Sequence, residues 1–446
     1  MSTPIAVALV RELAAANSRE PSSSAYAKAS VCLLDFLSCA FAGRQLPYAK
    51  QAIEAAAPWA LPAGVPVIAT DLRLAPPEAA FVNSLMAASA SRTDMHPAST
   101  SHPGAVIFPV ALACAALKPA NGRDFLRAVI VGYEAMGRLG RIVVGDRFKK
   151  TFRSTSVIGT IGGALTAARL LGLDEKQAVH ALAIAANAAA GLQEWAASGE
   201  LDLFYQPANA SRAVLSAALL SKAGSSASPT IIEGPSGFLN AYGGLDRAAE
   251  LLTSHDEWEI EQIEYKPVPA CVFVQAAAAA THKLVREHGN VGADIERVQL
   301  RTFGPAIEYP GCNNAGPIDG MQPARMSIQY TVASVLARAD LSDQTFIEID
   351  DPLTRKLTPR VELTEDPSFT KAFPARQGAE VEVQLRQGQT LRARVDEVPI
   401  YEDDLVRSRF RRVATALFPP KRVDGLERAC LACAQLPDVE ILQSPT

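Results

Sequence analysis

The chain has 446 residues, of which 48% are hydrophobic and 20% are charged, with a formal net charge of −4 and a pI near 6.0. This balance is typical of a globular protein and excludes intrinsic disorder, which needs low apolar content and high charge. The near-neutral charge provides no general field for nucleic acid, so we expect no nucleic-acid partner. The length is sufficient for two or three domains.

The hydrophobic runs predict no membrane segment. The longest, Ala105–Leu117, is interrupted by Pro109, and it is shorter than the about 20 residues that a bilayer span requires. The N-terminus has no basic region before its apolar residues, so it is interpreted as the start of a helix and not as a signal peptide. The seven cysteines lie mostly in apolar helical contexts. We therefore expect reduced, buried thiols in a cytoplasmic protein, including Cys430 and Cys433.

Helical periodicity and alanine dominate the chain up to about residue 250. Gly172 and Asp174 indicate a helix stop followed by an N-cap, which is typical of an αα-hairpin. The predicted helices are apolar over most of their surface, so several of them should be buried centrally. The predicted helices are Tyr26–Ala42, Pro77–Ala90, Phe125–Val143, Ser156–Leu171, Glu175–Ala190 and Ala208–Ala223.

From about Glu259 the pattern includes strands. Val298–Phe303 alternates apolar and polar residues, and Val381–Leu385 with Leu391–Val395 predicts a hairpin that turns at Gly388. Helices are predicted at Cys271–His288, at Ser327–Ala337 and, after Pro399, up to Leu426–Gln435. The sequence therefore predicts a mainly α protein: a large all-helical domain over 1–265, a smaller α+β lid domain over 266–397, and C-terminal helices over 398–446 that return to the helical domain.

The segment from Arg92 to Gly104 concentrates polar chemistry. It holds Asp94 and two of only six histidines, His96 and His102, and its prolines exclude a regular helix. Histidine titrates near neutral pH and suits proton transfer, so Asp94, His96 and His102 are candidate catalytic residues. Alternatively, this is a polar loop whose histidines cap helices. A metal site formed by the same three side chains is disfavoured, because no recognised ligand spacing or fourth ligand accompanies them.

Four cations lie between Arg147 and Arg153, directly before a predicted helix. Cations at a helix N-terminus oppose its dipole, which favours an anion-binding role over a stabilising one. Lys150 and Arg153 are the candidates, because they are nearest the helix start. For Arg147 and Lys149 a solvated basic loop is the better interpretation.

Two segments near the proposed domain boundary carry further candidates. Lys266 precedes two closely spaced prolines and could face a cleft, although from these residues alone a linker lysine in water is the better interpretation. Arg325 lies before a helix and could bind a substrate carboxylate or an internal acid. No phosphate loop, dinucleotide fingerprint or nucleophile elbow is present, and the glycines from Gly159 to Gly163 are attributed to close helix packing.

Several ordered segments together resemble the MmgE/PrpD family, which includes 2-methylcitrate dehydratase, cis-aconitate decarboxylase and iminodisuccinate epimerase. The resemblance implies a helical domain plus an α+β lid, a homodimer, no organic cofactor and no metal, and an active site between the domains. It makes His102 the loop histidine, Lys266 the boundary lysine and Tyr309 the cleft tyrosine. The segments are Ala29–Asp35, Asn83, Asp94 to Gly104, Gly132–Glu134, Gly159–Ala164, Leu170–Leu173, Glu233–Phe238, Lys266–Pro267 and Ala324–Tyr330.

The departures from the family pattern shape the expected reaction. Of the Asp-x-Asp-Asp motif only Asp94 remains, Arg153 replaces the histidine of Gly-Phe-His-x-Thr, and the stretch Leu203–Ala208 lacks the lysine and histidine of Lys-x-x-His-x-Gly. Dehydration needs an acid for the leaving hydroxyl, whereas epimerisation needs one base on each face and cations for the developing charge.

We therefore expect a cofactor-independent epimerase of a polycarboxylate amino compound such as iminodisuccinate. His102 and Lys266 would act as the two bases, from opposite walls of a cleft. The side chains expected to hold carboxylates are Arg92, Lys150, Arg153 and Arg325. The alternatives are a dehydratase-like or decarboxylase-like lyase, and a non-catalytic carboxylate-binding member.

Overall fold

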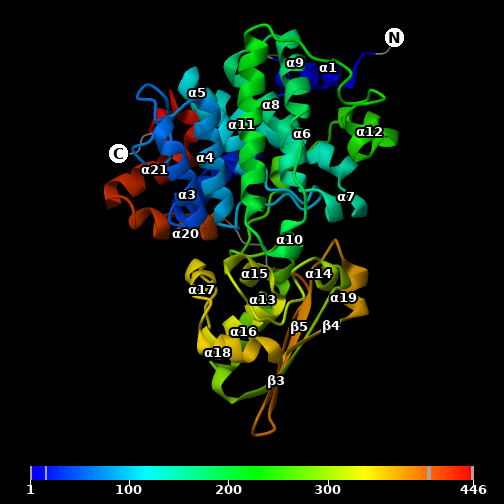
Figure 1. Ribbon diagram of the computed structural model, residues 1–446, viewed down its shortest axis with the longest axis vertical. Helices are drawn as coiled ribbons and strands as arrows, with labels where there is room; N and C mark the ends of the chain where they lie inside the picture. Colours follow the sequence, from blue (N-terminus) through cyan, green and yellow to red (C-terminus); the bar gives the residue numbers. More distant parts are fainter. Residues whose placement is uncertain (1–2, 16–17, 399–402, 443–446) are drawn as a thin grey trace. The chain divides into compact units, whose positions relative to one another are not determined.

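The computed structural model describes residues 3–15, 18–398 and 403–442 and contains two compact units. The helical unit comprises Met1–Gln193, Asp202–Tyr265 and Glu402–Thr446, and the sheet unit comprises Glu194–Leu201 and Lys266–Tyr401. The predicted fold class, mainly α with a smaller α+β part, is confirmed (Figure 1). Residues 194–201, which the sequence placed with the helices, pack with the sheet unit, and the end of the predicted lid adjoins 399–402, outside the described residues.

All the helices predicted for the first part of the chain form. The capping box of Asp174 and the left-handed Gly172, with φ of +68°, are both present. The helix predicted to begin at Ala208 begins at Asp202 and contains Pro207, because a helix can continue through a proline at the cost of one hydrogen bond. The helices are α1 (Ile5–Leu9), α2 (Ser23–Gly43), α3 (Pro47–Ala56), α4 (Pro76–Ser89), α5 (Gly104–Leu117), α6 (Gly122–Val143), α7 (Asp146–Thr151), α8 (Ser154–Leu171), α9 (Glu175–Ala186), α11 (Asp202–Lys222), α12 (Phe238–Tyr242), α20 (Asp403–Thr415) and α21 (Pro420–Leu431), beside a short ribbon of β1 (Val65–Pro66) and β2 (Arg73–Leu74).

Helix α8 is the central helix of the helical unit (Figure 1). Every residue of α8 except Arg169 is buried, and the helix packs against α5, α6, α9 and α11. A Cβ at Gly162 would lie 2.5 Å from the Gly132 carbonyl oxygen on α6, so the two backbones meet at a distance that only glycine permits. The packing role predicted for the glycines of this helix is confirmed.

Helix α2 corrects the expectation that no stretch could span a membrane. It is long and apolar enough by length and composition, but most of it is buried inside the helical unit. It packs against α4, α6, α20 and α21. Its apolar character is therefore explained by its place in the core, and Lys28 and Asp35 interrupt its apolar run.

The sheet unit is built on a four-stranded sheet of order β4–β3–β5–β6, with β3 parallel to β4 and antiparallel to β5. The strands are β3 (Ile295–Thr302), β4 (Val361–Glu365), β5 (Ala379–Leu385) and β6 (Thr390–Val395), and the predicted hairpin forms with Gly388 at φ of +87°. Alternate residues of β5 are buried beneath α13 (Gln275–His288), which contacts β5 and β6. The other helices are α10 (Trp195–Ser198), α14 (Gly304–Glu308), α15 (Met321–Met326), α16 (Ile328–Arg338), α17 (Asp343–Ile347), α18 (Pro352–Leu357) and α19 (Pro367–Ala372).

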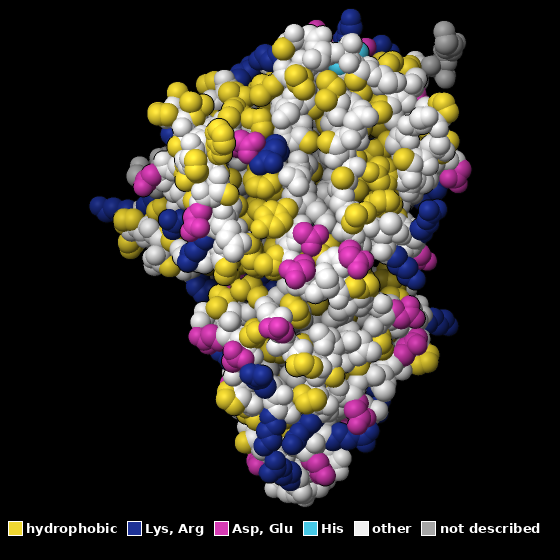
Figure 2. Space-filling view, in the orientation of Figure 1, with side chains coloured by type: hydrophobic (Ala, Val, Ile, Leu, Met, Phe, Trp, Pro, Cys, Tyr) yellow, Lys and Arg dark blue, Asp and Glu magenta, His cyan; other side chains and the backbone are white. Residues whose placement is uncertain are grey.

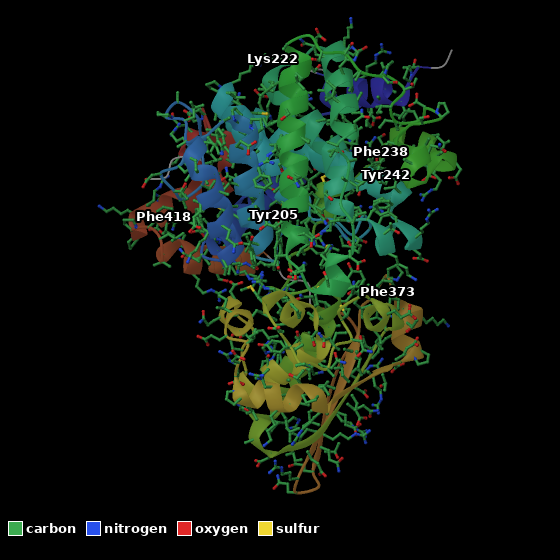
Figure 3. The ribbon with its side chains drawn as sticks, in the orientation of Figure 1. Tyr205, Lys222, Phe238, Tyr242, Phe373 and Phe418 are labelled. Atoms are coloured by element: carbon green, nitrogen blue, oxygen red, sulfur yellow. The ribbon has the colours of Figure 1, made fainter. Side chains whose placement is uncertain are left out.

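Aromatic rings pack together in both units, and the sheet unit carries charged side chains on its surface. In the helical unit the rings of Phe238 and Tyr242 lie 4.8 Å apart on α12, and in the sheet unit Phe303 and Phe373 stack at 5.0 Å (Figure 3). Acidic and basic side chains are interspersed on the visible surface of the sheet unit (Figure 2). One such pair is Arg301 on β3 and Glu380 on β5, at 2.6 Å. Mixed charge of this kind is typical of a solvated sheet face.

Candidate functional site

The loop between α4 and α5 brings the first group of candidate residues together in the helical unit. It runs from Ala90 to Pro103, closes on itself at the bridge between His96 and Ser101, and places Thr100 at φ of +47°. A Cβ at Gly140 of α6 would lie only 2.1 Å from the Cβ of Ser99, so this glycine lets the loop sit against the helix. The loop is thus a packed, ordered element.

His102 is half-buried at the end of this loop. Its backbone N–H donates to Thr155 Oγ1 at 3.0 Å, and its Nδ1 lies 2.8 Å from the carbonyl oxygen of Asp94. Because a carbonyl oxygen can only accept, Nδ1 carries the proton. In the neutral ring Nε2 therefore holds the lone pair that can accept a proton, and in the protonated ring Nε2 is the atom that can donate one.

The carboxyl of Asp94 is used inside the fold. Tyr133 Oη donates to Oδ2 at 2.6 Å and the Gly104 N–H donates to Oδ1 at 3.0 Å. Burial raises the pKa of Asp94 to about 7, although the Tyr133 hydrogen bond acts in the opposite direction. With only 2% of the residue exposed, Asp94 anchors the loop, and the catalytic role expected from the sequence stays a prediction.

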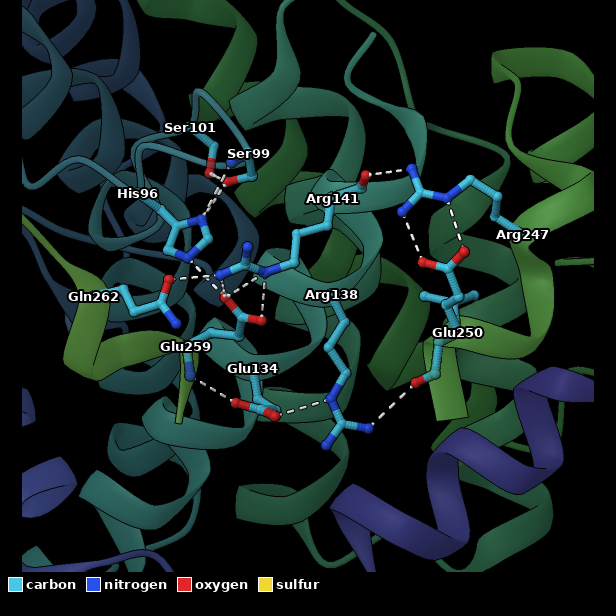
Figure 4. Close-up of polar contacts among 11 residues, drawn as sticks. His96, Ser99, Ser101, Glu134, Arg138, Arg141, Arg247, Glu250, Glu259 and Gln262 are labelled. Atoms are coloured by element: carbon cyan, nitrogen blue, oxygen red, sulfur yellow. Dashed lines mark hydrogen bonds and ion pairs between the residues drawn. The ribbon is translucent and has the colours of Figure 1, made fainter. Parts of the chain in front are cut away.

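His96 is held by contacts within the helical unit. Its Nε2 lies 2.8 Å from Glu259 and its Nδ1 lies 2.8 Å from Ser99 Oγ, with both ends of the ion pair about 2% exposed (Figure 4). Glu259 in turn accepts from Arg141, and its N–H donates to Glu134. Both ring nitrogens are engaged in contacts inside the fold, and the catalytic role expected for His96 stays a prediction. The described residues contain no group of three or more side chains suited to a metal ion.

Arg92 lies at the start of the same loop but is 1% exposed. Its guanidinium donates to the Ser38 carbonyl of α2 at 3.3 Å, and its charge favours the ionised form of Asp35 on the same helix. Burial nevertheless raises the pKa of Asp35 to about 6. Arg92 thus balances a buried carboxyl, and its role as a carboxylate ligand stays a prediction.

The basic segment and the loop meet at the N-terminus of α8. Ser154 donates to the Thr100 carbonyl and Thr155 accepts from His102, so the first turn of α8 holds the loop. Arg153 is the half-buried N-cap residue of α8, and its own N–H donates to the Gly191 carbonyl at 3.0 Å. The structure therefore places Arg153 and His102 beside the same helix turn.

Lys150 has a different setting from the predicted one. It lies in the last turn of α7, a helix that the sequence interpretation missed, and it is exposed. A cation in the last turn of a helix is favourable for the dipole, so the argument that these cations oppose a helix does not apply to Lys150. Its role as a carboxylate ligand stays a prediction.

In the sheet unit, Lys266 is buried, with 8% of the residue exposed, which excludes the interpretation as a linker lysine in water. The following segment is held by the Gln275 side chain, which accepts from the Val268 N–H at 3.0 Å and donates to the Ala270 and Cys271 carbonyls. These hydrogen bonds fix the backbone next to Lys266. Its burial on a fixed backbone makes Lys266 the candidate in this unit, and its catalytic role stays a prediction.

Arg325 and Tyr309 lie near the same segment of the sheet unit. The Cys271 N–H donates to the Arg325 carbonyl, and Cys271 and Cys312 bring their sulfurs to 3.8 Å. Arg325 is 1% exposed at the end of α15, with Asp343 at 3.9 Å, so the internal-acid alternative describes it better than a carboxylate ligand. Tyr309 is half-buried with its ring 4.9 Å from that of Phe273.

Sequence reasoning missed the residues that hold the candidates. Asp35 and Tyr133 lay in segments quoted only for the family resemblance, and Thr155 and Glu259 were given no role, although all four contact the loop. One signal was available: Asp35 is an acid inside an otherwise apolar helix. A buried carboxyl in such a position needs polar partners, so its presence predicts a polar cluster beside the helix.

Comparisons with known proteins agree with this fold. Residues 8–250 match the model of the MmgE/PrpD N-terminal domain, and residues 268–432 match that of the MmgE/PrpD C-terminal domain. The chain is 30% identical to cis-aconitate decarboxylase of Homo sapiens, covering 83% of this chain and 79% of that protein. It is 24% identical to cis-aconitate decarboxylase of Aspergillus terreus (94% and 91% covered) and 23% identical to 2-methylcitrate dehydratase of Escherichia coli strain K12 (79% and 76% covered). These relatives are lyases and give no specific support to an epimerase.

Proposed function

The chain belongs to the MmgE/PrpD family, and on that premise we propose that it is a lyase which decarboxylates cis-aconitate or a closely related tricarboxylate. This proposal replaces the epimerase expected from the sequence as the first candidate. It is supported by the decarboxylases among the relatives and by the geometry of His102.

The observation that carries the proposal is the hydrogen bond from His102 Nδ1 to the Asp94 carbonyl. When the bond to the departing carboxylate breaks, CO2 leaves and the electron pair stays on carbon, which must then be protonated by an acid. His102 in its protonated form can supply that proton from Nε2, since Nδ1 is held by the backbone. A half-buried imidazole is also shielded from bulk water while it remains accessible to a small molecule.

The charge around His102 suits an anionic substrate. Arg153 caps the first turn of α8, where His102 is tied to Thr155. An arginine with the N–H groups of a helix start favours a carboxylate, and it would stabilise the charge left on the substrate after CO2 loss. A tricarboxylate retains two carboxylates for such contacts after one has left.

The test is NMR of reactions run separately with cis-aconitate, 2-methylcitrate and iminodisuccinate in D2O. We expect cis-aconitate to lose one carboxyl as CO2 and to gain one deuterium on carbon. Loss of water from 2-methylcitrate without release of CO2 would show that the protein is a dehydratase and not a decarboxylase. No change in any substrate would refute the enzymatic proposal and favour a non-catalytic binding protein.

The role of His102 is tested by substitution. His102→Gln should lower kcat by about 10²- to 10⁴-fold, the usual contribution of a positioned acid or base. His288→Gln, at an exposed position near the end of α13, is the matched control and should leave kcat unchanged. Unchanged kcat in folded His102→Gln would remove His102 from the mechanism.

Epimerisation remains the second candidate because of the state of Asp94. Its carboxyl, the one acid left from the dehydratase motif, is bound by Tyr133 and Gly104 and is buried, so it is poorly placed to protonate a leaving hydroxyl. Epimerisation needs no such acid. Deuterium at the α-carbon of iminodisuccinate, with inversion and without bond loss, would favour this candidate over decarboxylation.

A further inference from the structure

We propose that Asp35 is a positioning residue that sets the working tautomer of His102 through the backbone of Asp94. The relation to activity rests on the proposed function. The tautomer is measured independently of turnover, so a failure of this inference can be distinguished from a failure of the proposed reaction.

Asp35 binds one of the two adjacent peptides whose carbonyls face His102. The Asp94 N–H donates to Asp35 Oδ2 at 3.0 Å, and the carbonyl of that same peptide, on Thr93, lies 3.3 Å from His102 Nδ1. The carbonyl of the next peptide, on Asp94, lies 2.8 Å from the same nitrogen. Asp35 lies within α2, a long buried helix, and is 1% exposed itself. The carboxyl is therefore a fixed acceptor on a rigid element, two hydrogen bonds away from the imidazole.

The Asp94 side chain supplies the remaining constraint. Its two oxygens accept from Tyr133 Oη and from the Gly104 N–H, so its side chain is held from α6 and from the first residue of α5. With the N–H bound by α2 and the side chain bound by two other helices, rotation of the Asp94 backbone is opposed from three sides. The peptide that carries the Asp94 carbonyl is itself held, because its N–H, on Met95, donates to the Glu264 carbonyl at 2.9 Å. The direction of the carbonyl, and with it the ring of His102, follows from all of these contacts.

The surroundings favour keeping an acid at position 35. Arg92, on the loop, and Arg409, on α20, both favour the ionised form of Asp35. Arg92 also donates to the Ser38 carbonyl, one turn further along α2, so the beginning of the loop is attached to α2 at two points. An apolar residue at position 35 would leave these two cations without their common counter-charge and would release the Asp94 N–H.

The chemical consequence concerns which nitrogen of His102 can transfer a proton. While the Asp94 carbonyl faces the ring, Nδ1 is protonated and Nε2 is the reactive atom. If the carbonyls of Thr93 and Asp94 turn away from the ring, this preference is lost. Part of the neutral population then carries its proton on Nε2, which cannot accept another. Loss of a residue that orients a functional histidine costs about 10- to 100-fold in comparable sites.

Two substitutions separate the hydrogen bond from the charge. Asp35→Leu keeps a side chain that branches at Cγ but has no acceptor for the Asp94 N–H, whereas Asp35→Asn keeps an oxygen acceptor and removes the charge. Glu427→Leu is the matched control, because Glu427 is a buried carboxyl of the helical unit that pairs with Arg407 and Arg411 and has no contact with the loop among its described partners. A purely structural role would make Asp35→Leu resemble this control.

The readouts are ¹⁵N NMR of labelled histidine, with the His102 signal assigned by its loss in His102→Gln, together with kcat and KM. We expect the Nδ1–H tautomer in the wild type and in Glu427→Leu, and a mixture in Asp35→Leu with kcat about 10- to 100-fold lower and KM little changed. Asp35→Asn should show a smaller population of the Nε2–H form and an intermediate kcat.

A single Nδ1–H tautomer in folded Asp35→Leu, or a kcat per folded molecule equal to that of the control, would overturn the inference. If Asp35→Leu does not fold, Asp35→Asn decides: an unmixed tautomer with unchanged kcat overturns the inference, and a mixture supports it. A wild type that shows the Nδ1–H tautomer but no lyase activity would refute the proposed reaction and leave the positioning role supported by the spectra alone.

Discussion

The ring of His102 donates its Nδ1 proton to the backbone carbonyl of Asp94, 2.8 Å away. Because a backbone carbonyl does not titrate in this range, the tautomer of His102 is not set by a proton shared with a carboxylate. The side chain of Asp94, whose pKa burial raises to about 7, meanwhile holds the loop through Tyr133 and Gly104. The backbone carbonyl of Asp94 thus orients His102, whereas the side-chain carboxyl of the same residue is the group that ionises.

His96 should matter for stability more than for chemistry. His96→Gln breaks the buried pair with Glu259, and we expect the free energy of unfolding to fall by about 3 kcal/mol, because Arg141 still compensates part of the stranded charge. Chemical denaturation measures this, with the exposed His255→Gln as control. Loss of kcat in His96→Gln with wild-type stability would restore the catalytic role that the sequence suggested.

Lys266 should be required for activity. Lys266→Met removes a buried ammonium but retains an unbranched side chain, so the protein should fold while kcat falls by at least about 10²-fold, as expected for a proton-transfer group. Circular dichroism and the decarboxylation assay test the two parts. Lys356→Met, at an exposed position on α18, serves as the control. Full activity of folded Lys266→Met would exclude Lys266 from the reaction.

Asp94 should make stability depend on pH between about 4 and 7. Burial raises its folded pKa from 3.8 to about 7, so the folded state binds the proton that the unfolded state has already released. Its contribution is complete below the unfolded value and is lost as the pH rises through the folded value, by about 4 kcal/mol in all. Asp35, with a pKa of about 6, adds in the same direction.

Asp94→Asn should therefore flatten the pH profile of the free energy of unfolding over that range, measured by urea denaturation at closely spaced pH values. Asp124→Asn, an exposed aspartate in the first turn of α6, gives the reference for a surface change. A slope equal to that of the wild type would mean that Asp94 ionises in the folded protein as it does in the unfolded chain.

Gly140 should be irreplaceable for the position of the loop. An added Cβ would lie 2.1 Å from Ser99 Cβ, so Gly140→Ala must displace the loop, at a cost of about 1–3 kcal/mol and with a fall in kcat through His102. Gly425→Ala is matched, because the same methyl group on α21 meets nothing within 4 Å and should stabilise the helix by up to about 1 kcal/mol. Equal effects of the two substitutions on kcat would contradict this account.

Most of the fold follows from local patterns in the sequence. The helix stop at Gly172, the cap at Asp174 and the hairpin turn at Gly388 depend on residues within a few positions of one another, and all three form as predicted. The ends of α9 and α11 differ from prediction by several residues, because packing extends or shortens a helix beyond its local signals.

The candidate site is less predictable from local sequence than the fold is. The sequence alone selected the loop from Arg92 to Gly104, because histidines, an acid and prolines are concentrated there. Residue type and spacing did not separate His102 from His96, which lie in the same loop, and only the family resemblance singled out His102. The tertiary structure shows how their environments differ, because Glu259, which pairs with His96, and Thr155, which holds His102, are 163 and 53 positions away in the chain. The number and type of reactive groups are local properties, whereas their ionisation and orientation are set by partners that only folding brings near.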